Sequence, residues 1–139
     1  MYEKILVAVD HSEITPRVLE AARGLAALSN GEVWVIHLRE RETVGRTGLL
    51  TSRESEGESE ADVTGAVETL AKAGITTHGV VRDVVFGQAA HEIVTEAQER
   101  GADVIMMSSR GRGDLAGLVL GSTAHKVIHL ADRQVLVIR

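Results

Sequence analysis

The sequence predicts an α/β fold built on a doubly wound, five-stranded parallel sheet with helices on both faces. Short apolar segments alternate along the chain with segments of helical periodicity, which is typical of parallel strands joined by right-handed helical crossovers. The stretch 104–107, Val-Ile-Met-Met, is apolar without alternation, as expected of a central strand that is covered on both faces. The 139 residues are enough for one domain, residues 1–139, and too few for two ordinary ones.

Composition excludes several classes of protein. The chain has no cysteine, so disulfides, thiol catalysis and a thiolate zinc site are excluded. A net charge of −5 without a basic stripe, together with only three aromatic residues, argues against nucleic acid as a partner. The first apolar run is too short for a signal peptide and no stretch is long enough to span a bilayer, so we expect a cytoplasmic protein without a membrane partner.

The first half of the chain predicts two strands, a helix and a long loop. Residues 5–9 and 33–38 are apolar and β-branched enough for buried strands. The helix between them is expected to be capped by Thr15, with Pro16 at its first position, or alternatively by Ser12. The stretch from Arg39 to Ser59 is rich in charged and small residues, which predicts a surface loop, either a lid or partner segment or a mobile insertion without a role.

The second half predicts three helices and three strands. A helix ending at Gly74 leads to a strand over 75–81 that is polar enough to lie at an edge. A helix opened by Phe86-Gly87 leads to the apolar strand over 104–107, and a last helix starts near Ser122. The final strand covers Val135 to Ile138.

A polar, glycine-bearing segment follows the central strand, from Ser108 to Thr123. Glycine lets main-chain N–H groups approach an anion closely, and a helix N-terminus adds unpaired N–H groups and partial positive charge. Phosphate is therefore the expected ligand. The alternative is a surface turn that needs glycine for positive φ, followed by an ordinary helix start.

This segment resembles the universal stress protein family, whose nucleotide-binding members carry Gly-x-x-Gly, nine residues and then Gly-Ser or Gly-Thr. Gly111, the nine residues 112–120 and Gly121-Ser122 match this pattern, whereas Ser108 stands where the first glycine is expected. The resemblance extends over nearly the whole chain. It implies an adenine-nucleotide alpha-hydrolase-like fold with strand order 3-2-1-4-5, in which Asp10 and the glycine loop flank one crevice.

The resemblance implies a site for an adenine nucleotide, ATP, ADP or AMP, with Mg²⁺ left open. Asp10 would contact the base, the backbone at Leu38 would meet the adenine ring, and basic side chains such as Arg110 and Arg112 would reach phosphate or stay solvated. Asp10 has an equal alternative as a local cap, and the apolar members would be core in any version of this fold. The expected site residues are Ala8, Val9, Asp10, Leu38, Met107, Ser108, Arg110, Gly111, Gly121, Ser122 and Thr123.

Ser108 decides how far the nucleotide hypothesis holds. With negative φ, serine is tolerated and its hydroxyl can donate to a ribose or phosphate oxygen. With positive φ, a non-glycine residue costs on the order of 1 kcal/mol. A Ser108 side chain that filled the hollow facing Asp10 would argue against a nucleotide.

Three functions are compatible with these patterns. The first is a nucleotide-binding regulatory or stress-response protein, the second a dimeric interaction protein of the same family without a nucleotide, and the third a slow ATPase in which Asp10 or His11 activates water. We expect no catalytic residues, because the glycine loop lacks a Walker lysine and no Gly-x-Ser-x-Gly elbow is present. The six histidines are too scattered for a zinc site, so no metal ligand is expected.

The last strand predicts a homodimer. Val135 to Ile138 is a short apolar strand at an expected sheet edge, and such edges favour pairing with a second copy. The resemblance implies dimerisation through this strand, although the proline usual just before it is replaced here by Arg133-Gln134.

Overall fold

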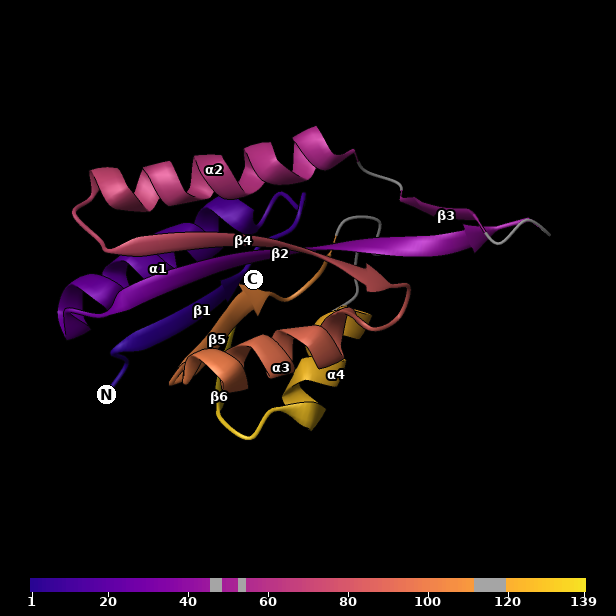
Figure 1. Cartoon of the computed structure of the whole chain (residues 1–139). Coiled ribbons are helices and arrows are strands. Elements are labelled where there is room, and N and C mark those ends of the chain that lie inside the picture. The colour runs from indigo at the N-terminus through magenta and orange to yellow at the C-terminus, as the bar shows by residue number, and fades with distance from the viewer. Residues whose placement is uncertain (46–48, 53–54, 112–119) are drawn as a thin grey trace.

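The computed structural model describes residues 1–45, 49–52, 55–111 and 120–139 (Figure 1). Strands and helices alternate along most of the chain. They are β1 (Lys4–Ala8), α1 (Thr15–Ser29), β2 (Glu32–Val44), β3 (Leu49–Ser52), α2 (Glu56–Lys72), β4 (Thr77–Val85), α3 (Ala89–Arg100), β5 (Val104–Ser108), α4 (Ser122–Leu130) and β6 (Gln134–Ile138).

The sheet has the predicted order. Five parallel strands lie in the sequence β4-β2-β1-β5-β6, which is the order 3-2-1-4-5 of the five predicted strands. β4 pairs only with β2 among the described residues, so the polar strand is at an edge as predicted. All five residues of β5 are buried, which agrees with the unbroken apolar pattern of 104–107.

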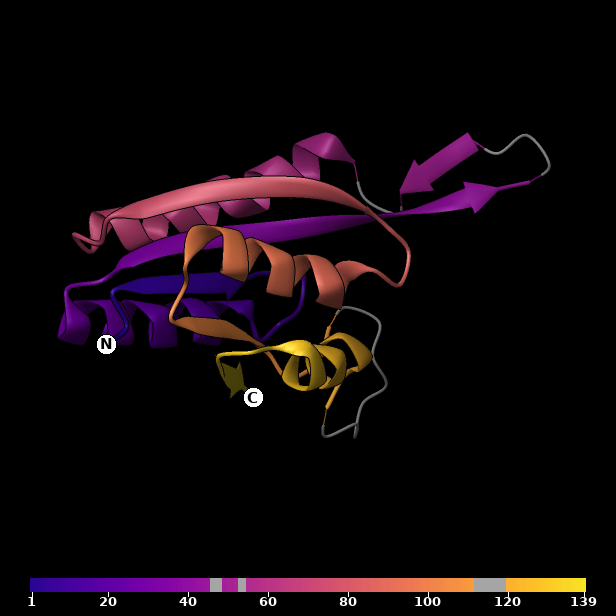
Figure 2. The same ribbon diagram turned by 60° about the horizontal axis from the view of Figure 1, so that its bottom comes forward.

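Helices cover both faces of the sheet (Figures 1 and 2). On one face, α1 and α2 pack against alternate residues of β1, β2 and β5, among them Ile5, Val35 and Met106. On the other, α3 and α4 pack against the intervening residues, among them Leu6 and Ile105. The winding reverses between β1 and β5, because the chain proceeds from β1 to β2 and β4 on one side and then returns to β5 and β6 on the other.

The predicted loop from Arg39 to Ser59 is wrong for most of its length. β2 continues to Val44 and pairs with the antiparallel strand β3, forming a hairpin that extends beyond the helices in both views (Figures 1 and 2). Its charged residues have partners across the sheet: Arg39 Nε donates to Asp83 Oδ1 at 2.6 Å and Arg41 lies 2.7 Å from Asp83 Oδ2. Pairing with β4 thus makes a strand of a segment whose composition indicated a loop.

Helix starts also differ from the predictions. The N-cap of α1 is Ile14, with no side-chain capping bond, so neither Thr15 nor Ser12 is the cap. The reason is that the Thr15 hydroxyl donates backwards to Asp10. α2 begins at Glu56 because Ser55 and Glu58 form a reciprocal capping box. Phe86-Gly87 is a turn before α3 rather than its first residues.

Candidate functional site

The carboxyl ends of β1 and β5 lie side by side at the point where the winding reverses. Residues pair in parallel from Ile5 with Val104 to Ala8 with Met107, so Asp10 and Ser108 emerge at the same edge of the sheet. In open α/β sheets, ligands bind at this place, beyond the carboxyl ends of the two strands. The predicted neighbourhood of the first strand and the strand that begins at Val104 is thereby confirmed.

Asp10 is held by three hydrogen-bond donors. The Ser12 N–H donates to Asp10 Oδ1 at 2.9 Å, and the Thr15 hydroxyl donates to the same oxygen at 3.0 Å and to the Asp10 carbonyl at 2.8 Å. The Ser108 hydroxyl donates to Oδ2 at 3.0 Å. Asp10 therefore acts as a local cap of the β1–α1 turn and, in addition, links β1 to β5.

Ser108 is the last residue of β5 and is only 5% exposed. It lies in extended backbone, and among the described non-glycine residues positive φ occurs at Tyr2 and Asn30. Serine is thus tolerated without backbone strain, which is the negative-φ alternative. Its hydroxyl, however, donates to Asp10 and so occupies one oxygen of the carboxylate that the nucleotide hypothesis assigns to the ligand.

The two ends of the glycine loop meet at the start of α4. The Gly121 N–H donates to the Ser109 carbonyl at 2.6 Å, and the Ser109 N–H donates to the Ile138 carbonyl at 2.7 Å. Gly121 is the N-cap residue with φ −73°, so positive φ is not why glycine stands there. Within the described chain no side chain caps this helix start. The first N–H groups, at Ser122 and Thr123, have no acceptor within the helix.

The remaining predicted residues divide between the two faces of the sheet. The side chains of Ala8, Leu38 and Met107 lie on the face covered by α3 and α4, whereas Val9 packs on the opposite face with α1. Arg110 is partly exposed and Gly111 is exposed at the start of the loop. Arg112 and Asp114 lie outside the described residues.

Two histidines complete this region: His11, which the sequence offered as a candidate to activate water, and His37, to which it assigned no role. His11 Nδ1 lies 2.5 Å from Asp62 Oδ2, which joins the β1–α1 turn to α2. The buried His37 donates from Nδ1 to the Val9 carbonyl at 2.8 Å, and its ring lies edge-on to that of His11 at 5.3 Å. No local pattern indicates these contacts, since they join separate elements.

Two contacts beside Asp10 do have a signal in the sequence. The spacing Asp-x-Ser-x-x-Thr over residues 10–15 is suited to a carboxylate that accepts from a following N–H and hydroxyl. The Ser12 hydroxyl oxygen is buried and has no hydrogen-bond partner among the described residues. Such an unmet group in an otherwise bonded turn is consistent with a polar ligand or water at this edge.

Over residues 1–45, 49–52, 55–111 and 120–139, no three histidine, aspartate or glutamate side chains lie close enough together to hold a metal ion. No helix in these ranges is long and apolar enough to cross a membrane.

Known proteins are similar to this chain in sequence and in fold. The sequence pattern of the Universal stress protein family matches residues 1–139. Universal stress protein YxiE of Bacillus subtilis is 32% identical over 152 residues, covering 100% of both chains. Universal stress protein MJ0577 of Methanocaldococcus jannaschii is 31% identical over 155 residues, covering 100% of this chain and 96% of its own.

Solved structures agree with the fold. The structure of MJ0577 superposes with a TM-score of 0.81 over 99% of this chain and 96% of that one, at 24% identity. A universal stress protein from Archaeoglobus fulgidus, solved in complex with dAMP, superposes with a TM-score of 0.75 at 27% identity, over 99% of this chain and 98% of that one. Because the match in sequence extends from end to end, this chain belongs to the universal stress protein family.

Proposed function

We propose that this protein is a regulatory protein that binds an adenine nucleotide in the crevice between the ends of β1 and β5. The observation that carries the proposal is the meeting of the Asp10 carboxylate, the end of β5 and the start of α4, which no described side chain caps, at one edge of the sheet. The dAMP complex of the Archaeoglobus fulgidus relative supports the choice of ligand.

The residues present fit a nucleotide at its phosphate end. The first N–H groups of α4 and the helix dipole favour a negative group beside Ser122 and Thr123, and Gly121 has no side chain to keep it away. Arg110, on the same loop, supplies a positive charge.

The end of the site at Asp10 fits the base or ribose once the hydrogen bond from Ser108 to Asp10 is broken. Asp10 would accept a hydrogen bond from a donor on the base or ribose, and its Oδ2 now accepts from Ser108. A nucleotide therefore exchanges one hydrogen bond for another at Asp10. The ends of β1 and β5 then differ between the bound and the free protein, so binding shifts the population toward one arrangement of the crevice. A protein that catalyses no reaction can transmit a signal through such a shift.

Calorimetric titration with AMP and ATP, with and without Mg²⁺, tests the proposal. We expect saturable binding, weakened at least tenfold in Asp10→Asn, since a neutral amide replaces the charged acceptor. Asp132→Asn makes the same change at an exposed residue between α4 and β6 and is expected to bind as the natural protein does. Absence of binding to both nucleotides at millimolar concentration would refute the proposal.

A second function is favoured by one observation. The Ser108 hydrogen bond satisfies Asp10 within the protein, which suits a family member that binds no nucleotide and acts as a dimeric interaction protein. Mass spectrometry of small molecules released from the purified protein discriminates the two: a co-purified adenine nucleotide supports the first function, and its absence together with negative calorimetry supports the second.

A further inference from the structure

We propose that Ser108 competes with the ligand for Asp10 and thereby sets the nucleotide affinity of this protein below that of a variant without the hydroxyl. This inference rests on the proposed function, because it concerns the same crevice. It assigns Ser108 the role of an internal competitor rather than that of a ligand contact.

The two carboxylate oxygens of Asp10 accept hydrogen bonds from different parts of the chain. Oδ1 accepts two local hydrogen bonds, from the Ser12 N–H and the Thr15 hydroxyl, which belong to the turn that follows β1. Oδ2 accepts from Ser108, which is 98 residues away in sequence and belongs to β5. The oxygen nearest to the β5 side of the crevice is therefore the one that Ser108 occupies, and a ligand donor must compete for it.

Sheet pairing and burial hold Ser108 in place beside Asp10. The Ser108 main chain pairs with Ile138 of β6, and the residue is only 5% exposed. One torsion, χ1, places its hydroxyl oxygen, so little entropy is lost in holding it against Asp10. Hydrogen bonds to a charged acceptor are stronger than those between neutral groups. Competition by such a group is expected to weaken a ligand by about tenfold or more.

The location of the contact predicts which ligands are affected. Ser108 acts at Asp10, whereas phosphate is proposed to bind at the start of α4. Removal of the hydroxyl is therefore expected to strengthen the binding of AMP and ATP by the same factor, about tenfold or more, which corresponds to ~1.4 kcal/mol or more. Affinity for inorganic pyrophosphate, which has no group for Asp10, is expected to stay within twofold.

The experiment compares the natural protein with Ser108→Ala, Ser108→Gly and the matched control Ser109→Ala. Ser109 is the next residue, is also buried, and makes main-chain hydrogen bonds with Gly121 and Ile138 that the substitution leaves in place. Titration with AMP, ATP and pyrophosphate is combined with thermal unfolding, which shows that each variant is folded. Two substitutions at 108 keep the test valid when one of them fails to fold.

Each outcome bears on the inference. Tighter nucleotide binding in the position-108 variants, with nucleotide binding by Ser109→Ala and the affinity for pyrophosphate unchanged, supports the inference. If the natural protein shows no measurable binding but the position-108 variants bind, the inference is still supported and only the proposed function is overturned. Nucleotide affinity unchanged by the loss of the hydroxyl overturns the inference and leaves the proposed function standing. No binding in any of the four proteins overturns both.

Discussion

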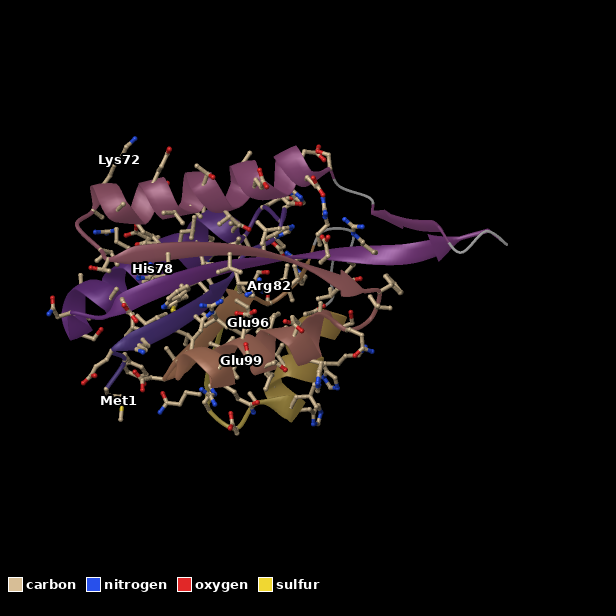
Figure 3. All side chains as sticks on the ribbon, in the orientation of Figure 1. Met1, Lys72, His78, Arg82, Glu96 and Glu99 are labelled. Carbon is tan, nitrogen blue, oxygen red and sulfur yellow. The ribbon has the colours of Figure 1, made fainter. Side chains whose placement is uncertain are left out.

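Glu96 of α3 is a carboxylate that is only 1% exposed and contacts two arginines, of which Arg82 is labelled near it in Figure 3. Arg82 Nε of β4 donates to Oε1 at 2.8 Å and Arg100 Nε donates to Oε2 at 2.8 Å, while the Arg100 guanidinium also lies 4.0 Å from the ring centre of Trp34. Burial alone would raise the pKa of the Glu96 carboxyl, but the hydrogen bonds and charges of the two arginines hold it below its ordinary value. The ion triad fastens α3 to the edge strand.

We expect Glu96→Gln to lower the free energy of unfolding by about 1–3 kcal/mol at pH 7, because two arginines lose their charged acceptor. The pKa of Glu96 is lower in the folded protein than in the unfolded chain, so its contribution is present above pH 4.5 and is lost as the pH falls through the folded-state pKa. Urea unfolding from pH 7 to pH 3 should show the difference between the two proteins closing at acid pH.

Glu99→Gln is the control, since Glu99 is exposed on the same helix (Figure 3). It should change the free energy of unfolding by less than about 0.5 kcal/mol. A pH-independent loss in Glu96→Gln would contradict an ionic origin.

At the scale of elements, α2 packs on β4 through a glycine in the strand. An ideal Cβ at Gly79 would lie 2.6 Å from Val63 Cγ1 and 2.9 Å from Val67 Cγ2. Valine side chains are stiff at χ1, so the helix cannot make room by a change of rotamer alone. Gly65 lies within α2 and a Cβ there meets no atom within 4 Å. Substitution by alanine should therefore destabilise the protein at Gly79 and stabilise it at Gly65.

We expect Gly79→Ala to lower the free energy of unfolding by about 1–3 kcal/mol through overpacking. Gly65→Ala should raise it by about 0.5–1 kcal/mol, because alanine restricts the unfolded chain and is the better helix former. Chemical unfolding of both variants measures this. Stabilisation by Gly79→Ala would show that α2 and β4 are not packed as described.

At the scale of the whole molecule, the two edges of the parallel sheet are β4 and β6. β6 pairs only with β5 within the described residues, and Leu136 at its centre is 42% exposed. An unpaired edge with an exposed leucine favours pairing with a second copy through a twofold axis, as proposed for the dimeric state. β4 presents Val85, 64% exposed, at the opposite edge.

Light scattering at micromolar concentration should give twice the chain mass of 14.9 kDa for the natural protein. Leu136→Glu is expected to shift the mass toward one chain, because two like charges would be buried at the twofold axis. Val85→Glu places the same charge at the far edge and should leave the dimer intact. One-chain mass for the natural protein would refute the dimer.

The fold was predictable because its main signals are local. A strand covered on both faces needs apolar side chains at every position, so 104–107 shows its central place directly, and Gly121-Ser122 marks the start of α4. The capping box of Ser55 and Glu58 was also readable, and using it would have placed the start of α2 correctly. Strand order came from family resemblance, since alternation alone leaves several orders possible.

By itself, the sequence determined the set of parallel strands and the residue types at their carboxyl ends. Only the tertiary structure decided what those residues do: that Asp83 neutralises Arg39 and Arg41 and makes their segment a strand, and that Ser108 donates to Asp10. The physical reason is the separation along the chain over which each interaction acts. Propensity and periodicity act between near neighbours in the chain, whereas a hydrogen bond or ion pair across strands depends on their register, which exists only once the sheet has formed.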